Sequence, residues 1–367
     1  MRSSGVIWVL GILAVLCLVT VTFLRGSDLR GYDAPPGQSF DAGHEPSEEH
    51  DAVVASLDVG IGPVQRAPRR QRLALMREYM DSVGASQDFH AQFTPADADG
   101  VPAEWVLAPG ADERRRVLYI HGGAFVMGSP RSHRNITSRF SEIAGAAVLA
   151  IDYRLMPEHS RIAGIEDCRS AYRWLVANGP GGPGQAEVIF VGGDSAGGNL
   201  TLSLIPWVRD QGMPSPIAAI ALSPVTDTTM GSPSLKHNLE TDAMLGPMFK
   251  GLRRIPKPLL WWFSLLQNRM SPRNPLVSPV YGDLSSLPPT LVHASEHELL
   301  FDDARRYVNR STEAGNDARL QSWAHVVHVW HMFYPQLTEA RQAWEEIGKF
   351  IAEVEGKDDT SIKGEHG

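Results

Sequence analysis

A serine flanked by glycines is the feature of this sequence best suited to nucleophilic chemistry. Ser195 lies in Gly-Asp-Ser-Ala-Gly (193–197), which follows the apolar run 188–191 and precedes a second apolar segment. The order strand, Gly-x-Ser-x-Gly, helix is typical of a tight turn that strains the serine backbone and exposes its hydroxyl. Side chains at Gly193 and Gly197 would collide with neighbouring backbone, so glycine is expected at both. The pattern predicts a nucleophile, with backbone N–H groups at the helix N-terminus available to stabilise an oxyanion.

A nucleophilic serine needs a histidine as its base and an acid that orients this histidine. The segment 323–333 lies between the last predicted strand and the closing helix, where a loop would deliver a base to Ser195. Its histidines are His325, His328 and His331. The segment 295–303 directly follows the predicted strand 290–294, and its acidic residues are Glu296, Glu298, Asp302 and Asp303.

Composition excludes several classes of protein. The chain has 367 residues, of which 43% are hydrophobic and 21% charged, as in globular proteins. The net charge of −8 and the lack of a basic tract interleaved with aromatics argue against nucleic-acid binding. Cys17 and Cys168 are the only cysteines, which excludes a disulfide framework and a cysteine-based metal site.

Apolar strands alternate with helical segments along the middle of the chain. This order predicts an α/β fold with a mostly parallel sheet that helices cover on both faces. The expected strands are 101–107, 117–120, 144–151, 188–191, 217–222 and 290–294, and the expected helices are 69–83, 166–177 and 341–354.

The N-terminal segment 6–24 has no charged residue and lies between Arg2 and Arg25. It is long enough to cross a bilayer as a helix, and no small-residue cleavage site follows it. The segment 1–26 is therefore predicted to be an uncleaved membrane anchor, with an extracytoplasmic (periplasmic or lumenal) catalytic domain. A cleaved leader would give a secreted enzyme instead.

The remaining chain divides by composition. The stretch after the anchor is rich in Gly, Pro, Asp and Glu without periodicity, which predicts a flexible tether. The aromatic cluster around Trp261 and Trp262 lies in a segment without sheet periodicity, and is either packed core or a surface facing lipid or an acyl chain. The expected parts are a tether at 27–56, a catalytic domain at 57–355 with cap elements at about 57–92 and 225–271, and a polar tail at 356–367.

The sequence resembles the hormone-sensitive-lipase-like group of α/β-hydrolase esterases. The resemblance rests on His-Gly-Gly (121–123) ahead of the 193–197 motif, with further similar stretches at 152–159 and 274–279, and it extends over about 101–350. It implies an α/β-hydrolase fold with a mostly parallel central sheet and a helical cap.

The resemblance also implies residue roles. It assigns the base to His328, before Val-Trp, and the acid to Glu298, where most relatives carry aspartate. Asp302 is the alternative acid, although Asp302 and Asp303 would otherwise begin the following helix.

The oxyanion hole implied by the resemblance consists of the backbone N–H groups of Gly122, Gly123 and Ala196. His121 is expected to make structural hydrogen bonds, and Asp194 to support the serine turn. Although His-x-x-His-x-x-His spacing also occurs in metal sites, a loop is expected here, so neither a metal nor an organic cofactor is predicted.

The function implied is a serine carboxylic-ester hydrolase, an esterase or lipase acting on small or short-to-medium acyl esters through an acyl-enzyme. A lactone hydrolase or a deacetylase of small molecules would use the same triad, whereas a ligand receptor of this fold would keep the serine turn and lose the base. The expected partner is a small-molecule ester. The oligomeric state is not fixed by the sequence, and a homodimer is compatible with it.

Overall fold

The computed structural model describes residues 2–35, 37–40, 45–83 and 89–364. In this part of the chain nine strands form one sheet, in the order β1-β11-β10-β9-β8-β4-β5-β3-β2. In this sheet order, all neighbours in the run β1-β11-β10-β9-β8-β4-β5 pair in parallel. The strand β3 is antiparallel to both β5 and β2. The strands are β1 (Gln38–Phe40), β2 (Gln92–Asp97), β3 (Pro102–Leu107), β4 (Asp112–Ile120), β5 (Ala146–Ile151), β8 (Val188–Asp194), β9 (Ala218–Leu222), β10 (Thr290–Ser295) and β11 (Ala318–Trp323), with a separate ribbon of β6 (Asn178–Gly179) and β7 (Gly182–Pro183).

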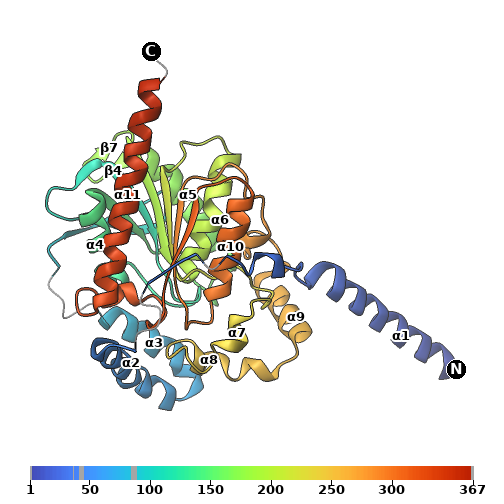
Figure 1. Ribbon diagram of the computed structural model, residues 1–367. Helices are drawn as coiled ribbons and strands as arrows, with labels where there is room; N and C mark the ends of the chain where they lie inside the picture. Colours follow the sequence, from blue (N-terminus) through green and yellow to red (C-terminus); the bar gives the residue numbers. More distant parts are fainter. Residues whose placement is uncertain (1, 36, 41–44, 84–88, 365–367) are drawn as a thin grey trace.

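Helices cover both faces of the sheet (Figure 1). α4 and α11 pack on one face, and α5, α6 and α10 pack on the other. The helices are α1 (Arg2–Val19), α2 (Glu48–Arg66), α3 (Arg69–Val83), α4 (Arg134–Ala144), α5 (Arg161–Ala177), α6 (Ala196–Asp210), α7 (Ser234–His237), α8 (Gly246–Phe249), α9 (Lys257–Asn268), α10 (Phe301–Glu313) and α11 (Thr338–Gly364). Short 3₁₀ turns span Arg30–Tyr32, Arg131–His133, Leu252–Arg254, Pro279–Tyr281 and Trp330–Phe333.

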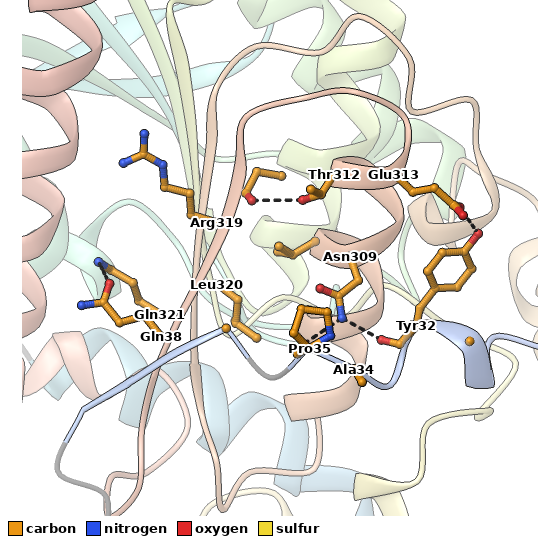
Figure 2. A pocket seen from close by; sticks show the side chains of 14 residues that line it. Tyr32, Ala34, Pro35, Gln38, Asn309, Thr312, Glu313, Arg319, Leu320 and Gln321 are labelled. Carbon is orange, nitrogen blue, oxygen red and sulfur yellow. Dashed lines mark hydrogen bonds between the residues drawn. The ribbon is translucent and has the colours of Figure 1, made fainter.

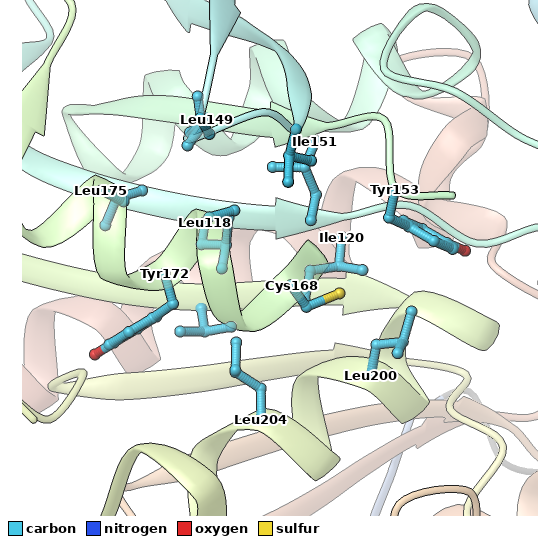
Figure 3. Close-up of a cluster of buried hydrophobic side chains, with 14 of the residues drawn as sticks. Leu118, Ile120, Leu149, Ile151, Tyr153, Cys168, Tyr172, Leu175, Leu200 and Leu204 are labelled. Carbon is cyan, nitrogen blue, oxygen red and sulfur yellow. The ribbon is translucent and has the colours of Figure 1, made fainter. Parts of the chain in front are cut away.

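The core explains why the central strands are continuously apolar. Leu118 and Ile120 of β4 pack beside Leu149 of β5 and face Tyr172 and Leu175 of α5 (Figure 3). Strands covered on both faces bury every side chain, so their sequences do not alternate. The α/β prediction is therefore confirmed, with the predicted strands at β3, β4, β5, β8, β9 and β10 and the helix 69–83 at α3.

The segment 27–56 differs from the flexible tether predicted from its composition. Within it, β1 pairs in parallel with β11 and forms the edge of the sheet, and α2 already begins at Glu48. The Asn309 side-chain amide also donates to the carbonyls of Tyr32 and Pro35, both at 2.9 Å, beside a cavity of about 530 Å³ (Figure 2). Backbone pairing with a sheet edge therefore orders residues whose composition alone favours disorder.

The N-terminal segment is helical, but the predicted membrane span is not supported. Among the described residues, no helix is both long and apolar enough to cross a bilayer. The regular helix ends at Val19 and is followed by a π-helical turn, Thr20–Leu24. Leu24 is fully buried, and the Ser271 hydroxyl donates to the carbonyl of Phe23 at 2.5 Å, so the end of the predicted span packs against the protein.

The closing helix is longer than predicted. α11 begins at Thr338 and continues to Gly364, into the stretch predicted as a polar tail, whose residues 365–367 lie outside the described chain.

Candidate active site

The turn that carries Ser195 has the strained geometry predicted from its glycines. Ser195 links β8 to α6 with φ 50° and ψ −113°, and its N–H donates to the carbonyl of Leu222 at 2.7 Å. A Cβ atom on Gly197 would lie 1.9 Å from the carbonyl oxygen of Ile120, and one on Gly193 would lie 2.6 Å from that same oxygen. Only glycine fits at either position, and the close approach of β4 fixes the turn.

The predicted acid and base contact each other at the same edge of the sheet. Glu298 follows β10 and His328 follows β11, and the two side chains are buried with Oε2 of Glu298 2.7 Å from Nδ1 of His328. Because β8, β10 and β11 belong to the parallel part of the sheet, their carboxyl ends meet at the edge where Ser195 lies. Among the described residues no hydrogen bond joins the Ser195 hydroxyl to His328, and catalytic hydrogen bonds are often long in free enzymes.

The loop carrying Glu298 is held by backbone and cap contacts. The N–H of Ser295 donates to Oε1 of Glu298 at 3.3 Å, and the Asn238 amide donates to the Glu298 carbonyl at 2.8 Å. The neighbouring N–H of Leu299 donates to the carboxylate of Asp242 at 2.8 Å. Residues 234–242 therefore fix the orientation of the acid from the side opposite the strand.

The residue directly after the predicted base His328 has a strained backbone. Val329 has φ 51°, a left-handed conformation that is unfavourable for a β-branched residue. Its N–H donates to the hydroxyl of Ser223 at 3.2 Å. Strain maintained by surrounding contacts is typical of functional sites. Here it determines the path of the backbone directly after His328.

The charges of the pair favour a protonated histidine. Burial lowers the pKa of His328, but the Glu298 carboxylate outweighs it, and the pKa lies above the ordinary value of 6.5. Burial raises the pKa of Glu298, and His328 opposes this rise. A protonated His328 is thus stabilised by the Glu298 carboxylate.

Asp302, the alternative acid, has other partners. Its carboxylate accepts the N–H of Ser234 at 2.7 Å and pairs with Arg305. The neighbouring Asp303 accepts the N–H groups of Thr226 and Asp227 at 2.7 and 2.9 Å. Both aspartates lie in the first turn of α10 and tie it to the loop after β9, so the geometry favours Glu298 as the acid.

The loop after β4, residues 121–127, carries two of the predicted oxyanion donors, and we call it the oxyanion loop. The N–H group of Gly122 is not available as predicted. This N–H donates to Oδ1 of Asp194 at 3.0 Å and is therefore engaged within the protein. By contrast, the described part of the chain offers no acceptor to the N–H groups of Gly123 and Ala124. Gly123 has φ 113° and Ala124 has φ 53°, so the loop turns sharply at the two residues whose N–H groups are free.

Asp194 connects this loop to the serine turn. Its buried carboxylate accepts the Tyr119 hydroxyl at 2.6 Å and lies 3.3 Å from Nε2 of His133. Burial alone would raise the pKa of Asp194, but His133 outweighs it and the pKa is lowered, so the carboxylate stays ionised. The expected supporting role of Asp194 has a structural basis here. Sequence reasoning missed Tyr119, His133 and Ser223, because none belongs to a recognised motif.

His121 is buried and stacks on Tyr153 with ring centroids 4.4 Å apart. Its Nδ1 lies 2.7 Å from the Gly122 carbonyl, as expected of a structural hydrogen-bonder. Burial and then His133 lower the pKa of His121 to about 3, so the ring is neutral near pH 7.

The three histidines of the 325–331 segment point to separate partners. His325 packs edge-on against His297, and His331 lies 2.9 Å from Nδ1 of His293. Only His328 faces Glu298. In the described residues, no cluster of three or more His, Cys, Asp or Glu side chains could hold a metal ion.

A groove of about 650 Å³ lies between the two segments predicted as cap elements. α2 and α3 line one side, residues 243–250 line the other, and Met127 from the oxyanion loop borders it. Its apolar lining consists of Leu57, Ile61, Val64, Leu73, Met76, Met127, Ala243, Met244, Pro247 and Met248. Met127 lies four residues beyond Gly123 in the chain, so the groove borders the loop that follows β4.

Comparisons with known proteins show the family to which this fold belongs. The alpha/beta hydrolase fold family matches residues 117–332. An acetyl-hydrolase of Streptomyces hygroscopicus is 38% identical over 255 residues, covering 70% of this chain and 81% of that protein. The carboxylesterase/phospholipase LipF of Mycobacterium tuberculosis is 35% identical over 279 residues, covering 74% of this chain and 72% of that protein. The crystal structure of an esterase from the bacterial hormone-sensitive lipase family is 36% identical with a TM-score of 0.72, covering 85% of this chain and 99% of that chain.

The pKa of His328 gives a test of the acid. A general base must be neutral, so kcat/KM for p-nitrophenyl acetate should rise with pH through a midpoint above 6.5. Glu298→Gln removes the charge that raises this pKa while burial still lowers it. The midpoint should therefore move to lower pH, and kcat should fall by roughly 10³–10⁴-fold.

Asp302→Asn is the matched control and should leave the midpoint unchanged. If Asp302→Asn shifted the profile and Glu298→Gln did not, the acid would be Asp302.

Proposed function

We propose that this chain, which belongs to the α/β-hydrolase fold family, hydrolyses small or short-to-medium acyl esters through an acyl-enzyme on Ser195. Its homology to esterases makes it an ester-hydrolysing enzyme of the hormone-sensitive-lipase-like group. The observation that supports the residue roles best is the buried Glu298–His328 contact of 2.7 Å at the sheet edge that carries the strained serine.

In the proposed mechanism the Ser195 oxygen attacks the ester carbonyl carbon while Nε2 of His328 accepts the serine proton. His328 then returns this proton to the oxygen of the leaving alcohol, and the acyl group remains on Ser195. Water, deprotonated by His328, attacks the acyl-enzyme; the bond from the acyl carbon to the Ser195 oxygen breaks, the carboxylic acid leaves, and His328 returns the proton to the serine oxygen. Glu298 holds Nδ1 of His328 as the donor, so that Nε2 faces the serine, and stabilises the imidazolium in both steps.

The developing oxyanion needs backbone donors that are not already engaged. We assign this role to the N–H groups of Gly123 and Ala124, together with that of Ala196 at the N-terminus of α6. Gly122 instead anchors the loop through Asp194. The engaged N–H of Gly122 thus positions the two donors that follow it.

The groove between α2, α3 and residues 243–250 is the proposed binding site for the apolar part of the substrate. Methionine side chains line it at four positions and adapt to different acyl or alcohol shapes. Acetyl esters are a second candidate class, since a relative that is 38% identical carries the name acetyl-hydrolase.

Removing the nucleophile tests the mechanism. Ser195→Ala should lower kcat for p-nitrophenyl butyrate by roughly 10⁴–10⁶-fold, because the acyl-enzyme can no longer form. Ser203→Ala is a matched control on the same helix, where the hydroxyl only donates to the Asn199 carbonyl. It should retain near-normal turnover, and both variants should keep the circular dichroism of the folded protein. Near-normal hydrolysis by Ser195→Ala would refute the mechanism.

Narrowing the groove tests the substrate site. Met76→Trp places a larger side chain among the groove residues and should reduce kcat/KM for p-nitrophenyl laurate at least ~tenfold relative to the acetate ester. Val59→Trp is the control, since Val59 is 77% exposed on α2 and does not line the groove. Equal losses for both esters in Met76→Trp would show that acyl chains bind elsewhere.

A further inference from the structure

The cap segment 248–266 exposes large apolar side chains to solvent. On α9, Leu259, Phe263 and Leu266 are 59%, 64% and 75% exposed, and their i, i+4, i+7 spacing places them on one stripe of the helix. Exposed apolar side chains continue N-terminally along the chain. We call the whole set the cap surface, and it comprises Met248, Leu252, Ile255, Leu259, Phe263 and Leu266.

The structure rules out the interpretation that this aromatic segment is simply packed core. No residue of α9 is fully buried. Trp261 and Trp262 face inward, where their indole N–H groups donate to the Thr229 carbonyl at 2.7 Å and to the Thr20 hydroxyl at 2.8 Å. The helix is therefore held in place by its tryptophans while its other face remains uncovered. An exposed apolar face of this kind marks an interaction site.

The charged residues of the stretch that carries the cap surface are all basic, although the whole chain carries a net charge of −8. No Asp or Glu occurs between Asp242 and Asp283, and the charged residues there are Lys250, Arg253, Arg254, Lys257, Arg269 and Arg273. Arg253, Arg254, Lys257 and Arg269 are exposed, and none forms an ion pair with the described residues, whereas Lys250 pairs with Glu240 at 2.7 Å. Lysine and arginine around exposed Leu and Phe are the composition of a helix that lies at the surface of an anionic bilayer.

The N-terminal helix leads to the same conclusion. The turn Thr20–Leu24 at the end of α1 contacts α9, and α1 itself projects away from the body of the protein (Figure 1). Its apolar side chains are exposed, among them Trp8 at 75% and Leu18 at 62%. The junction is fixed by the Thr20–Trp262 contact and by a hydrogen bond of 3.2 Å from Arg273 to the Thr22 carbonyl. The base of an uncovered apolar helix is thus attached to the basic, apolar cap.

We propose that the cap surface docks the enzyme on an anionic lipid bilayer. Leu259, Phe263 and Leu266 enter the acyl boundary, while the surrounding arginines and lysines bind lipid phosphates. Met248 belongs both to the cap surface and to the lining of the groove, so a docked bilayer lies at the edge of the proposed substrate site. This docking is a property of the surface and does not require that the esterase mechanism be correct.

Vesicle flotation with the full chain tests the proposal. The wild type should float with vesicles of phosphatidylcholine containing roughly 30% phosphatidylglycerol, and much less with phosphatidylcholine alone. Phe263→Glu with Leu266→Glu should lower the bound fraction at least ~tenfold, because the apolar stripe becomes charged. Arg253→Glu with Arg254→Glu should reduce binding to the level found on phosphatidylcholine alone. Binding should also weaken as salt rises from about 0.1 M to about 1 M.

Two controls separate the cap surface from other apolar sites. Val59→Glu changes a side chain that is 77% exposed on α2 and should bind vesicles like the wild type. Ile12→Glu with Leu16→Glu tests α1, whose residues are also exposed. All variants should hydrolyse soluble p-nitrophenyl acetate at the wild-type rate, which shows that they are folded.

Three results would overturn the proposal. The first is wild-type binding by the Phe263→Glu, Leu266→Glu variant while the α1 variant loses binding, because α1 alone would then carry the interaction. The second is the absence of flotation by the wild type. The third is a wild-type dimer that the cap variant converts to a monomer without any vesicle binding, since a second copy of the chain would then cover the cap surface.

Discussion

The buried carboxylate of Asp194 is the interaction on which the rest of the site depends. It directly precedes Ser195, and it binds the Tyr119 hydroxyl, the Gly122 N–H and His133, all from the strand β4 or the segment after it. One ionised side chain thereby holds the serine turn and the oxyanion loop at a fixed separation. The serine turn and the end of β4 also cannot approach each other more closely, because Gly197 already lies against the Ile120 carbonyl. Catalysis of ester hydrolysis requires this rigidity, because donors must already face the position where negative charge develops.

Around this fixed pair the sheet supplies the other groups from its parallel strands. Glu298 and His328 lie on the loops that follow the neighbouring strands β10 and β11. The cap residues Asn238 and Asp242 bind the backbone at Glu298 and at the residue after it. The cap thus contacts the loop that carries Glu298 and lines the groove that we propose for the substrate. The outer face of the cap makes neither of these contacts, and its side chains are apolar and basic. An enzyme that orients its acid from a membrane-facing cap would have its active site close to esters dissolved in the bilayer.

Much of the fold was predictable because the central strands carry an unbroken apolar signal and helices alternate with them. The elements that were missed include the helix α4 and the strands β1, β2 and β11. β11 contains Arg319, Gln321 and Ser322, and β1 has only three residues, so neither has the apolar pattern of a strand. β11 pairs with both β10 and β1, and this pairing is a tertiary contact that local composition does not encode.

A motif implies the positions of Ser195, Glu298 and His328, and the structure brings Glu298 and His328 into contact. Contacts made by side chains outside these motifs were not predictable. The engagement of Gly122 depends on the direction of the Asp194 carboxylate, and the strain at Val329 depends on Ser223. Likewise, the sequence around Trp261 and Trp262 is compatible with core and with surface, and the hydrogen bonds of the two indoles and the exposure of Phe263 show which face is outward.

The central claim is that Ser195 is activated as a nucleophile in the folded protein. The most direct measurement is reaction with a fluorophosphonate, followed by mass spectrometry of the proteolytic peptides. The account predicts one covalent adduct per chain, located on Ser195, with loss of esterase activity in proportion to labelling. An adduct on another residue, or a folded protein that remains unlabelled, would contradict it.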